Sequence, residues 1–581
     1  MMVNSSWIYI RSFGKIIKYF PFLLFNYFIF ANTAYSQGNT INQIMQSRMV
    51  QIQDTQLLLI DGNRIASVKV IPELYAQRNF SPAWKDNKKR DELIQIIRHI
   101  DEEGLNPKDY FLDSLIRYQN SGKDLSDNDR VDFDILLTES LLRLAYHIRF
   151  GKVDPRSLDS NWNYSRSLEN IDPVNIIQSM IDSDSIKAFI DRTVPRQPFY
   201  GRYKKVLAEY RKIREQGGWQ PVSPGPTLKP GMEDTRVAEL KRRLQVTGDL
   251  PGTVSGPVNH FDVSLEAAVK NFQERHRLEP DGLVGKNTLQ ALNVSVDDRI
   301  DQIRVNLERG RWVFEDVQGE FFVINIAGFQ AFLVRDNQVV WDARVMVGRP
   351  YRKTPVFKTE MKYMVLNPTW TVPPGILRKD ILPKGNEVPA YLREKGMDVL
   401  DQAGNRINPD SLDWLALSGR NFPYILRQPP GPTNALGRIK FIFPNPHLVY
   451  LHDTPNKELF EHPERTFSSG CIRIENPLEL AELIMGDREK WNQQSFTRAI
   501  ETNRTQTIYL PKPLTVLFLY WTVMIDQDGQ EIFLNDVYDR DKDILKALDG
   551  EFKFSLPEGL PDRYYNYEIP EQIKDAGYTM R

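Results

Sequence analysis

The sequence is poor in cysteine, since its 581 residues contain a single one, Cys471. One cysteine forms no internal disulfide, so a disulfide framework does not define this fold. The chain also lacks an excess of charge, because 75 Lys and Arg against 76 Asp and Glu leave a formal net charge of −1. Nucleic-acid binding requires a basic domain or stripe. The balanced charge therefore gives no support for a nucleic-acid partner.

Long hydrophobic runs are also scarce. The apolar segment 19–30 follows a basic region and is interrupted by Pro21 and Asn26, which makes it short for a bilayer span. Small residues follow it as far as Ser36. This order predicts a secretory signal over 1–36 that is cleaved before Gln37, with an uncleaved inner-membrane anchor as the alternative. We expect an exported protein of the periplasm or cell envelope.

The remaining length accommodates several domains. Apolar residues at three- and four-residue spacing, as in Asp91–Ile100 and Phe133–Tyr146, predict a helical domain over 38–220, with helix starts near Asp91 and Asp132. Proline and glycine dominate the stretch that follows and predict a linker. The remaining boundaries that we predict are a linker over 221–232, a small helical module over 233–295 and a connecting helix over 298–315.

From residue 320 the apolar pattern changes to that of strands, and Asp336-Asn337 has the composition of a hairpin turn. We predict a mainly β domain over 320–545, interrupted by a helical and loop insertion over about 376–430 that serves as a lid. The apolar run 515–525 is too short for a membrane helix and predicts a buried strand, followed by a hairpin that completes the sheet. The tail 546–581 carries no clear pattern. The predicted class is thus multidomain α + β.

The motif Ser468-Ser469-Gly470-Cys471-Ile472-Arg473 holds the single cysteine, and His452 ends an apolar strand upstream. A thiol needs a base or a positive field to become a nucleophile near neutral pH. We therefore expect Cys471 to be the nucleophile and His452 its base. Small residues allow close approach of the backbone, so the amides of Gly470 and Cys471 are expected to stabilise an oxyanion, with Ser469 assisting. Arg473 is expected to lower the pKa of the thiol or to hold a carboxylate.

The pattern of His452, Ser468, Gly470, Cys471 and Arg473 resembles the signature of L,D-transpeptidases with a YkuD-type catalytic domain. Segments 431–437 and 440–445 resemble the YcbB-like subgroup, and residues 233–295 resemble a three-helix peptidoglycan-binding domain. Ser469 departs from relatives that have histidine at this position, so a role of that second imidazole does not transfer.

The resemblance implies attack of Cys471 on a tetrapeptide stem, release of the terminal D-alanine and resolution of the thioester by an amine of a second stem. It implies no cofactor and no metal. The implied partners are the donor and acceptor stem peptides and other wall synthases. The substrate contacts that we predict are Tyr450, Asn434, Arg378 and Tyr424.

Three other interpretations stay open. An L,D-carboxypeptidase, or hydrolase, uses the same residues with water as the acceptor. A metal site would use His452, His462 and Cys471, although their spacing differs from that of most zinc sites. A non-catalytic wall-binding scaffold would rely on residues 233–295 alone.

Overall fold

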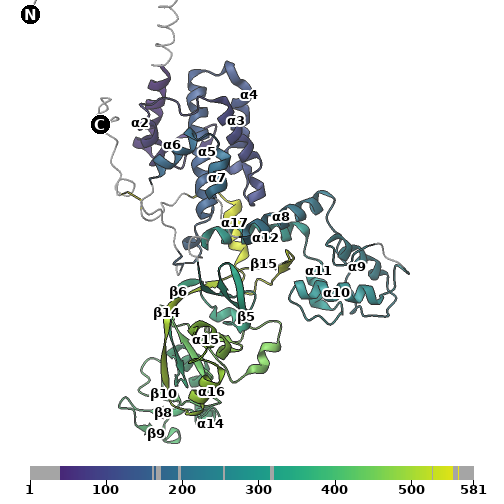
Figure 1. The fold of residues 1–581 in the computed structure, drawn as a ribbon, viewed down its shortest axis with the longest axis vertical. Coiled ribbons are helices and arrows are strands. Elements are labelled where there is room, and N and C mark those ends of the chain that lie inside the picture. The colour runs from purple at the N-terminus through teal and green to yellow at the C-terminus, as the bar shows by residue number, and fades with distance from the viewer. Residues whose placement is uncertain are drawn as a thin grey trace, which may run out of the picture.

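The computed structural model describes residues 40–159, 162–164, 172–193, 198–252, 256–313, 319–526, 528–553 and 560–561. A helical part, a small helical module and a β barrel follow one another along the chain (Figure 1). The predicted α + β class is confirmed. The predicted signal over 1–36 and most of the predicted C-terminal tail lie outside the described residues.

The N-terminal helical part packs around α5, which is buried along most of its length. The Ser126 hydroxyl caps α5 in a capping box with Asp129, and Asp86 caps α3, so both helices begin a few residues before the predicted starts near Asp132 and Asp91. The helices of this part are 40–55, α2 (Val70–Gln77), α3 (Asn87–Arg98), α4 (Leu112–Ser121), α5 (Asp127–Phe150), α6 (Pro173–Asp182), α7 (Ile186–Thr193) and α8 (Pro198–Glu215). A short hairpin, β1 (Leu59–Ile60) and β2 (Asn63–Arg64), lies between the first two helices.

The small module contains α9 (Thr235–Val246), α10 (Val263–Arg275) and α11 (Lys286–Leu292) around a core of its own. The Arg275 guanidinium binds Asp249 of the module at 2.6 Å and Glu531 near the C-terminus at 2.8 Å. This buried arginine therefore joins the module to the rest of the protein.

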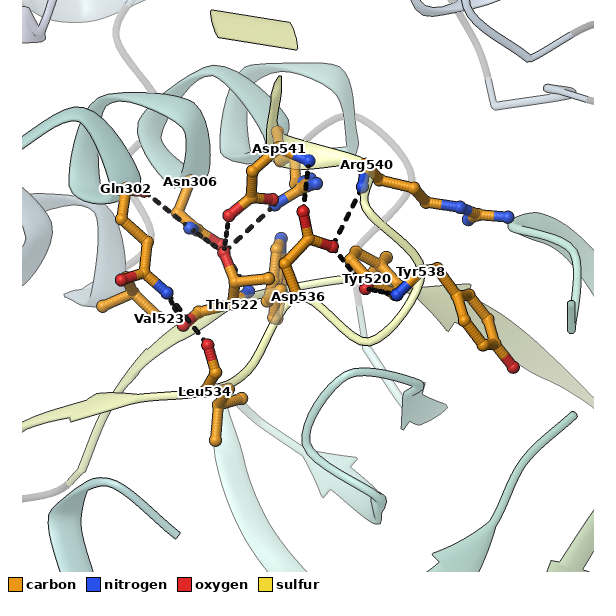
Figure 2. A network of polar contacts seen from close by, with 12 residues as sticks. Gln302, Asn306, Tyr520, Thr522, Val523, Leu534, Asp536, Tyr538, Arg540 and Asp541 are labelled. Carbon is orange, nitrogen blue, oxygen red and sulfur yellow. Dashed lines mark hydrogen bonds and ion pairs between the residues drawn. The ribbon is translucent and has the colours of Figure 1, made fainter. Parts of the chain in front are cut away.

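Helix α12 (Val296–Val313) leads from the module to the barrel and packs against α8 and against α17 (Asp541–Asp549). Its Asn306 side chain accepts the Thr522 N–H at 2.9 Å and donates to the Thr522 hydroxyl at 2.8 Å (Figure 2). Asn306 and Thr522 are fully buried. Helix α12 and the segment after the last barrel strand are thus held together by satisfied buried polar groups.

Eight strands form a closed barrel in the order β11-β12-β13-β5-β4-β3-β14-β6. The β4–β5 turn has Asp336 and Asn337 at positive φ, as the sequence predicts for this hairpin. Helices α15 (Pro477–Met485) and α16 (Gln493–Glu501) follow the motif. The strands are β3 (Phe321–Asn325), β4 (Gln330–Arg335), β5 (Gln338–Met346), β6 (Phe357–Leu366), β11 (Ile439–Ile442), β12 (Leu451–His452), β13 (Ile472–Ile474) and β14 (Gln506–Leu519).

The insertion between β6 and β11 differs from the predicted helix and loop, because it contains a four-stranded sheet in the order β7-β10-β8-β9. Helix α14 (Val388–Glu394) and a short helical stretch, η7 (Leu377–Ile381), pack on this sheet around Trp414 and other apolar side chains. Short, polar-flanked strands carry little periodicity, so the sequence did not reveal them. The strands are β7 (Trp370–Thr371), β8 (Asp398–Leu400), β9 (Arg406–Ile407) and β10 (Ile425–Gln428).

The predicted hairpin after the last barrel strand forms, but it does not complete the barrel sheet. Within the described ranges, strands β15 (Val523–Ile525) and β16 (Glu531–Phe533) pair with each other and with no barrel strand. They pack against α8, α10 and α12, which contribute the apolar surface that covers them. No helix in the described ranges has the length and hydropathy needed to cross a membrane.

Candidate active site

The motif lies where the parallel strands β12 and β13 run side by side. His452 pairs in register with Arg473, and the Ile472 N–H donates to the Tyr450 carbonyl at 2.9 Å. Leu451 and Ile472 point into the barrel core and are fully buried. Because side chains alternate along a strand, His452, Arg473 and the flanking residues project from the opposite, outer face.

His452 is only 4 % exposed, and its Nδ1–H donates to the Asp453 carbonyl at 2.5 Å. This bond selects the tautomer whose Nε2 carries a lone pair. Burial and, after it, the Arg473 charge lower the pKa of His452 to about 3. The imidazole is therefore neutral at pH 7, and its Nε2 is unprotonated.

Cys471 is half-buried, and its Sγ–H points to the Leu448 carbonyl at 3.8 Å. Burial raises the pKa of the thiol, while the Tyr450 backbone, Lys440 and Arg473 lower it in part. Lys440 and Arg473 act on the pKa of His452 as well. The thiol and the imidazole thus face the same two cations.

Ser468 shapes the turn before the thiol. Its hydroxyl donates to the Cys471 carbonyl at 2.5 Å and accepts the Gly470 N–H at 3.0 Å. The Gly470 N–H, which we expected to stabilise an oxyanion, is therefore already bonded to the Ser468 hydroxyl. The Cys471 N–H has no hydrogen-bond partner among the described residues. Among the described residues, the Cys471 N–H is thus a backbone donor of this turn that remains available, as is the Ser469 N–H.

Arg473 is largely buried, and its Nε has no hydrogen-bond partner within the described part of the chain. Lys440, on the neighbouring strand β11, lies over the Tyr450 ring with Nζ 3.5 Å from its centroid. Residue-by-residue reading of the sequence missed Lys440. Its position in a strand between the core residues Ile439 and Phe441 was the available signal.

Arg352 was also missed. Its guanidinium binds Asp380 of the insertion through two bonds of 2.6 and 2.9 Å and donates to the Ser469 hydroxyl at 2.7 Å. The insertion is therefore tied directly to the motif turn. Because Arg352, Asp380 and Ser469 lie far apart in the sequence, no local pattern connects them.

The four predicted substrate contacts fall in different surroundings. Tyr450 lies beside Cys471, whose charge raises the pKa of the phenol after the larger effect of burial. Asn434 is fully buried and donates its amide to the Pro429 carbonyl at 2.8 Å, so the predicted substrate contact gives way to a structural role. Tyr424 packs on the core of the insertion, and Arg378 is exposed there. In the described part of the chain, neither of these two side chains hydrogen-bonds to the Cys471 thiol or shifts its pKa.

The alternative metal site finds no support in the geometry. In the part of the chain that the structure describes, no group of three or more His, Cys, Asp and Glu side chains is arranged to hold a metal ion. The His462 ring instead packs edge-on against Phe467.

Three domain families match the sequence. Residues 69–207 match "Scaffold domain", residues 233–292 match "Putative peptidoglycan binding domain" and residues 319–504 match "L,D-transpeptidase catalytic domain" of the YkuD family. A protein of Haemophilus influenzae called "Putative L,D-transpeptidase" is 33% identical over 291 residues, which are 48% of this chain and 58% of that protein. The chain thus matches less than two thirds of its relative.

Two crystal structures of bacterial proteins were compared as well. The L,D-transpeptidase of Xylanimonas cellulosilytica is 15% identical, over 51% of this chain and 100% of that one, with a TM-score of 0.17. The L,D-transpeptidase of Stackebrandtia nassauensis is 14% identical, over 52% and 97%, with a TM-score of 0.19.

Proposed function

We propose that this chain cross-links peptidoglycan through a thioester on Cys471; the matches of residues 319–504 to an L,D-transpeptidase catalytic domain and of residues 233–292 to a peptidoglycan-binding domain support this. The same two matches support a location in the cell envelope. A single observation supports the proposal most strongly. His452 ends β12 and Cys471 directly precedes the paired strand β13, where His452 lies in register with Arg473, and the charges of Lys440 and Arg473 act on both groups.

In the acylation step, the Nε2 of His452 takes the thiol proton while Sγ attacks the carbonyl carbon of the bond before the terminal D-alanine. The Cys471 N–H stabilises the oxyanion that forms, and one such donor contributes about 3 to 4 kcal/mol. When the tetrahedral intermediate collapses, the C–N bond breaks. The D-alanine amine receives the proton from His452, and the acyl group stays on Cys471 as a thioester.

In the second step, an amine of another stem loses its proton to His452 and attacks the thioester carbonyl. The C–S bond breaks, an amide forms, and the thiolate regains the proton. Lys440 and Arg473 contribute positive charge beside the thiolate, and Arg473 has a donor free for the carboxylate of the donor stem. Residues 233–292 would hold the enzyme on the wall, where other synthases work.

Mass spectrometry of the full chain after incubation with a tetrapeptide stem tests the thioester. We expect an acyl adduct on wild-type protein, none on Cys471→Ser, and a rate lower by about 100-fold or more on His452→Ala. Elemental analysis that finds a stoichiometric metal lost together with activity would overturn this mechanism.

Muropeptide analysis separates transfer from hydrolysis. We expect new cross-links when donor and acceptor stems are both supplied. Trimmed stems without cross-links would show the carboxypeptidase instead, with water resolving the thioester. Full cell-wall function in the Cys471→Ser strain would favour a non-catalytic scaffold.

A further inference from the structure

The peptide unit between Gly470 and Cys471 is held from behind by Thr354. The Thr354 hydroxyl donates to the Gly470 carbonyl at 2.9 Å and accepts the Gly348 N–H at 2.9 Å. Thr354 is fully buried. A trans peptide is planar, so its C=O and N–H point in opposite directions. Fixing the Gly470 carbonyl therefore fixes the direction of the Cys471 N–H.

Tyr538 holds Thr354 in turn. The Tyr538 hydroxyl accepts the Thr354 N–H at 3.2 Å and donates to the Gly348 carbonyl. The side chain of Tyr538 is 1 % exposed, so water does not compete for these bonds. A closed set of hydrogen bonds thus joins Tyr538, Thr354 and Gly348 to the back of the nucleophile turn.

Tyr538 is itself fixed by the segment that follows the barrel. Its N–H donates to the Tyr520 hydroxyl at 2.8 Å, and that hydroxyl donates to Asp536 at 2.6 Å (Figure 2). The Asp536 carboxylate also accepts the Asp541 N–H at 2.8 Å. Asp541 pairs with Arg309 of α12 at 2.6 Å. Support for the turn therefore reaches as far as α12.

We propose that Thr354 and Tyr538 are positioning residues that aim the Cys471 N–H at the developing oxyanion. The working catalytic unit then extends past the matched residues 319–504 to the segment 520–541. This inference rests on the proposed acylation of Cys471. It goes further by assigning the orientation of the oxyanion donor to side chains that never contact substrate.

Two reactions of the same thiol test the inference. Acylation by a tetrapeptide stem forms an oxyanion, whereas alkylation by iodoacetamide displaces iodide and forms none. In Thr354→Val we expect kcat for acylation to fall by about 10- to 100-fold with KM changed less than about twofold, because the oxyanion exists only in the transition state. Alkylation should stay within about twofold of wild type.

Two further variants complete the set. Tyr538→Phe removes only the hydroxyl and should lower kcat by about 3- to 10-fold. Thr354→Ser keeps the donor and should restore acylation to within about threefold. The matched control is Tyr203→Phe, because the buried Tyr203 hydroxyl donates to the Val523 carbonyl away from the turn.

Equal losses of acylation and alkylation, or no rescue by Thr354→Ser, would overturn the inference, because both indicate a general distortion of the turn. The inference would also be overturned if a stem acylated wild type normally and acylated Thr354→Val and Tyr538→Phe at the same rate. A wild-type protein that no stem acylates would instead overturn the proposed function, and this inference with it.

Discussion

The Arg473 guanidinium and the His452 imidazole lie opposite each other on the parallel strands β13 and β12, and the arginine charge lowers the pKa of the histidine. Burial is the larger cause of the same shift. A buried imidazole that stays neutral keeps its Nε2 unprotonated, and it links stability to pH.

The pH dependence of stability follows from this shift. The pKa of His452 is about 3 when folded and about 6.5 when unfolded, so the unfolded state binds more protons between these values. The contribution of His452 to the free energy of unfolding is therefore complete above pH 6.5, and it falls as the pH decreases toward 3. When the pH is lowered from 7 to 5, the free energy of unfolding measured in urea should decrease by about 2 kcal/mol more for wild type than for His452→Asn. The other buried histidines cancel in this difference, and parallel pH curves for the two proteins would contradict the prediction.

Removing Lys440 should make the thiol harder to ionise, because the lysine charge lowers the pKa of Cys471. The alkylation rate of Lys440→Met should rise with pH along a curve shifted to higher pH than that of wild type. Lys362→Met is the matched control, since Lys362 is exposed on β6. A curve for Lys440→Met that coincides with the control would show that this charge does not reach the thiol.

Alkylation of Cys471 also tests the contact of Arg352 with Asp380 of the insertion and with Ser469 of the turn. Asp380→Asn removes the charge that Arg352 binds beside Ser469, so the turn should open more often and Cys471 should alkylate about two- to fivefold faster. High salt should reduce the difference by screening the wild-type pair. Asp410→Asn breaks the exposed pair with Arg393 in the same insertion and should leave alkylation unchanged. Equal effects of the two variants would refute a specific tie.

Gly348 permits the close packing behind the motif. A Cβ at this position would lie 2.1 Å from the Arg352 carbonyl oxygen and 3.1 Å from the Gly470 Cα, and backbone atoms cannot move away cheaply. Gly348→Ala should lower the thermal midpoint by several degrees and reduce acylation by about tenfold or more. Gly375→Ala, with nothing within 4 Å of its Cβ, is the control. Normal acylation in Gly348→Ala would contradict this account.

Part of this architecture was predictable from the sequence. Helical periodicity identified the region of α5, and Asp336-Asn337 identified the β4–β5 hairpin, because local propensity and the buried face agree there. The sequence did not predict the insertion sheet, and it predicted the β15–β16 hairpin but wrongly joined it to the barrel sheet. Their strands are short, and other elements supply the surfaces that cover them.

The sequence by itself determined the chemical parts of the candidate site, a lone Cys471 and a His452 in a recognisable order of residues. Only the tertiary structure decided how they are arranged: the Gly470 N–H bonds to Ser468, the Cys471 N–H stays open, and Thr354 holds the peptide between them. The physical reason is the separation along the chain of the groups that interact. A motif is local in the chain, whereas pKa shifts, buried hydrogen bonds and the direction of a peptide plane depend on groups that meet only when the barrel closes.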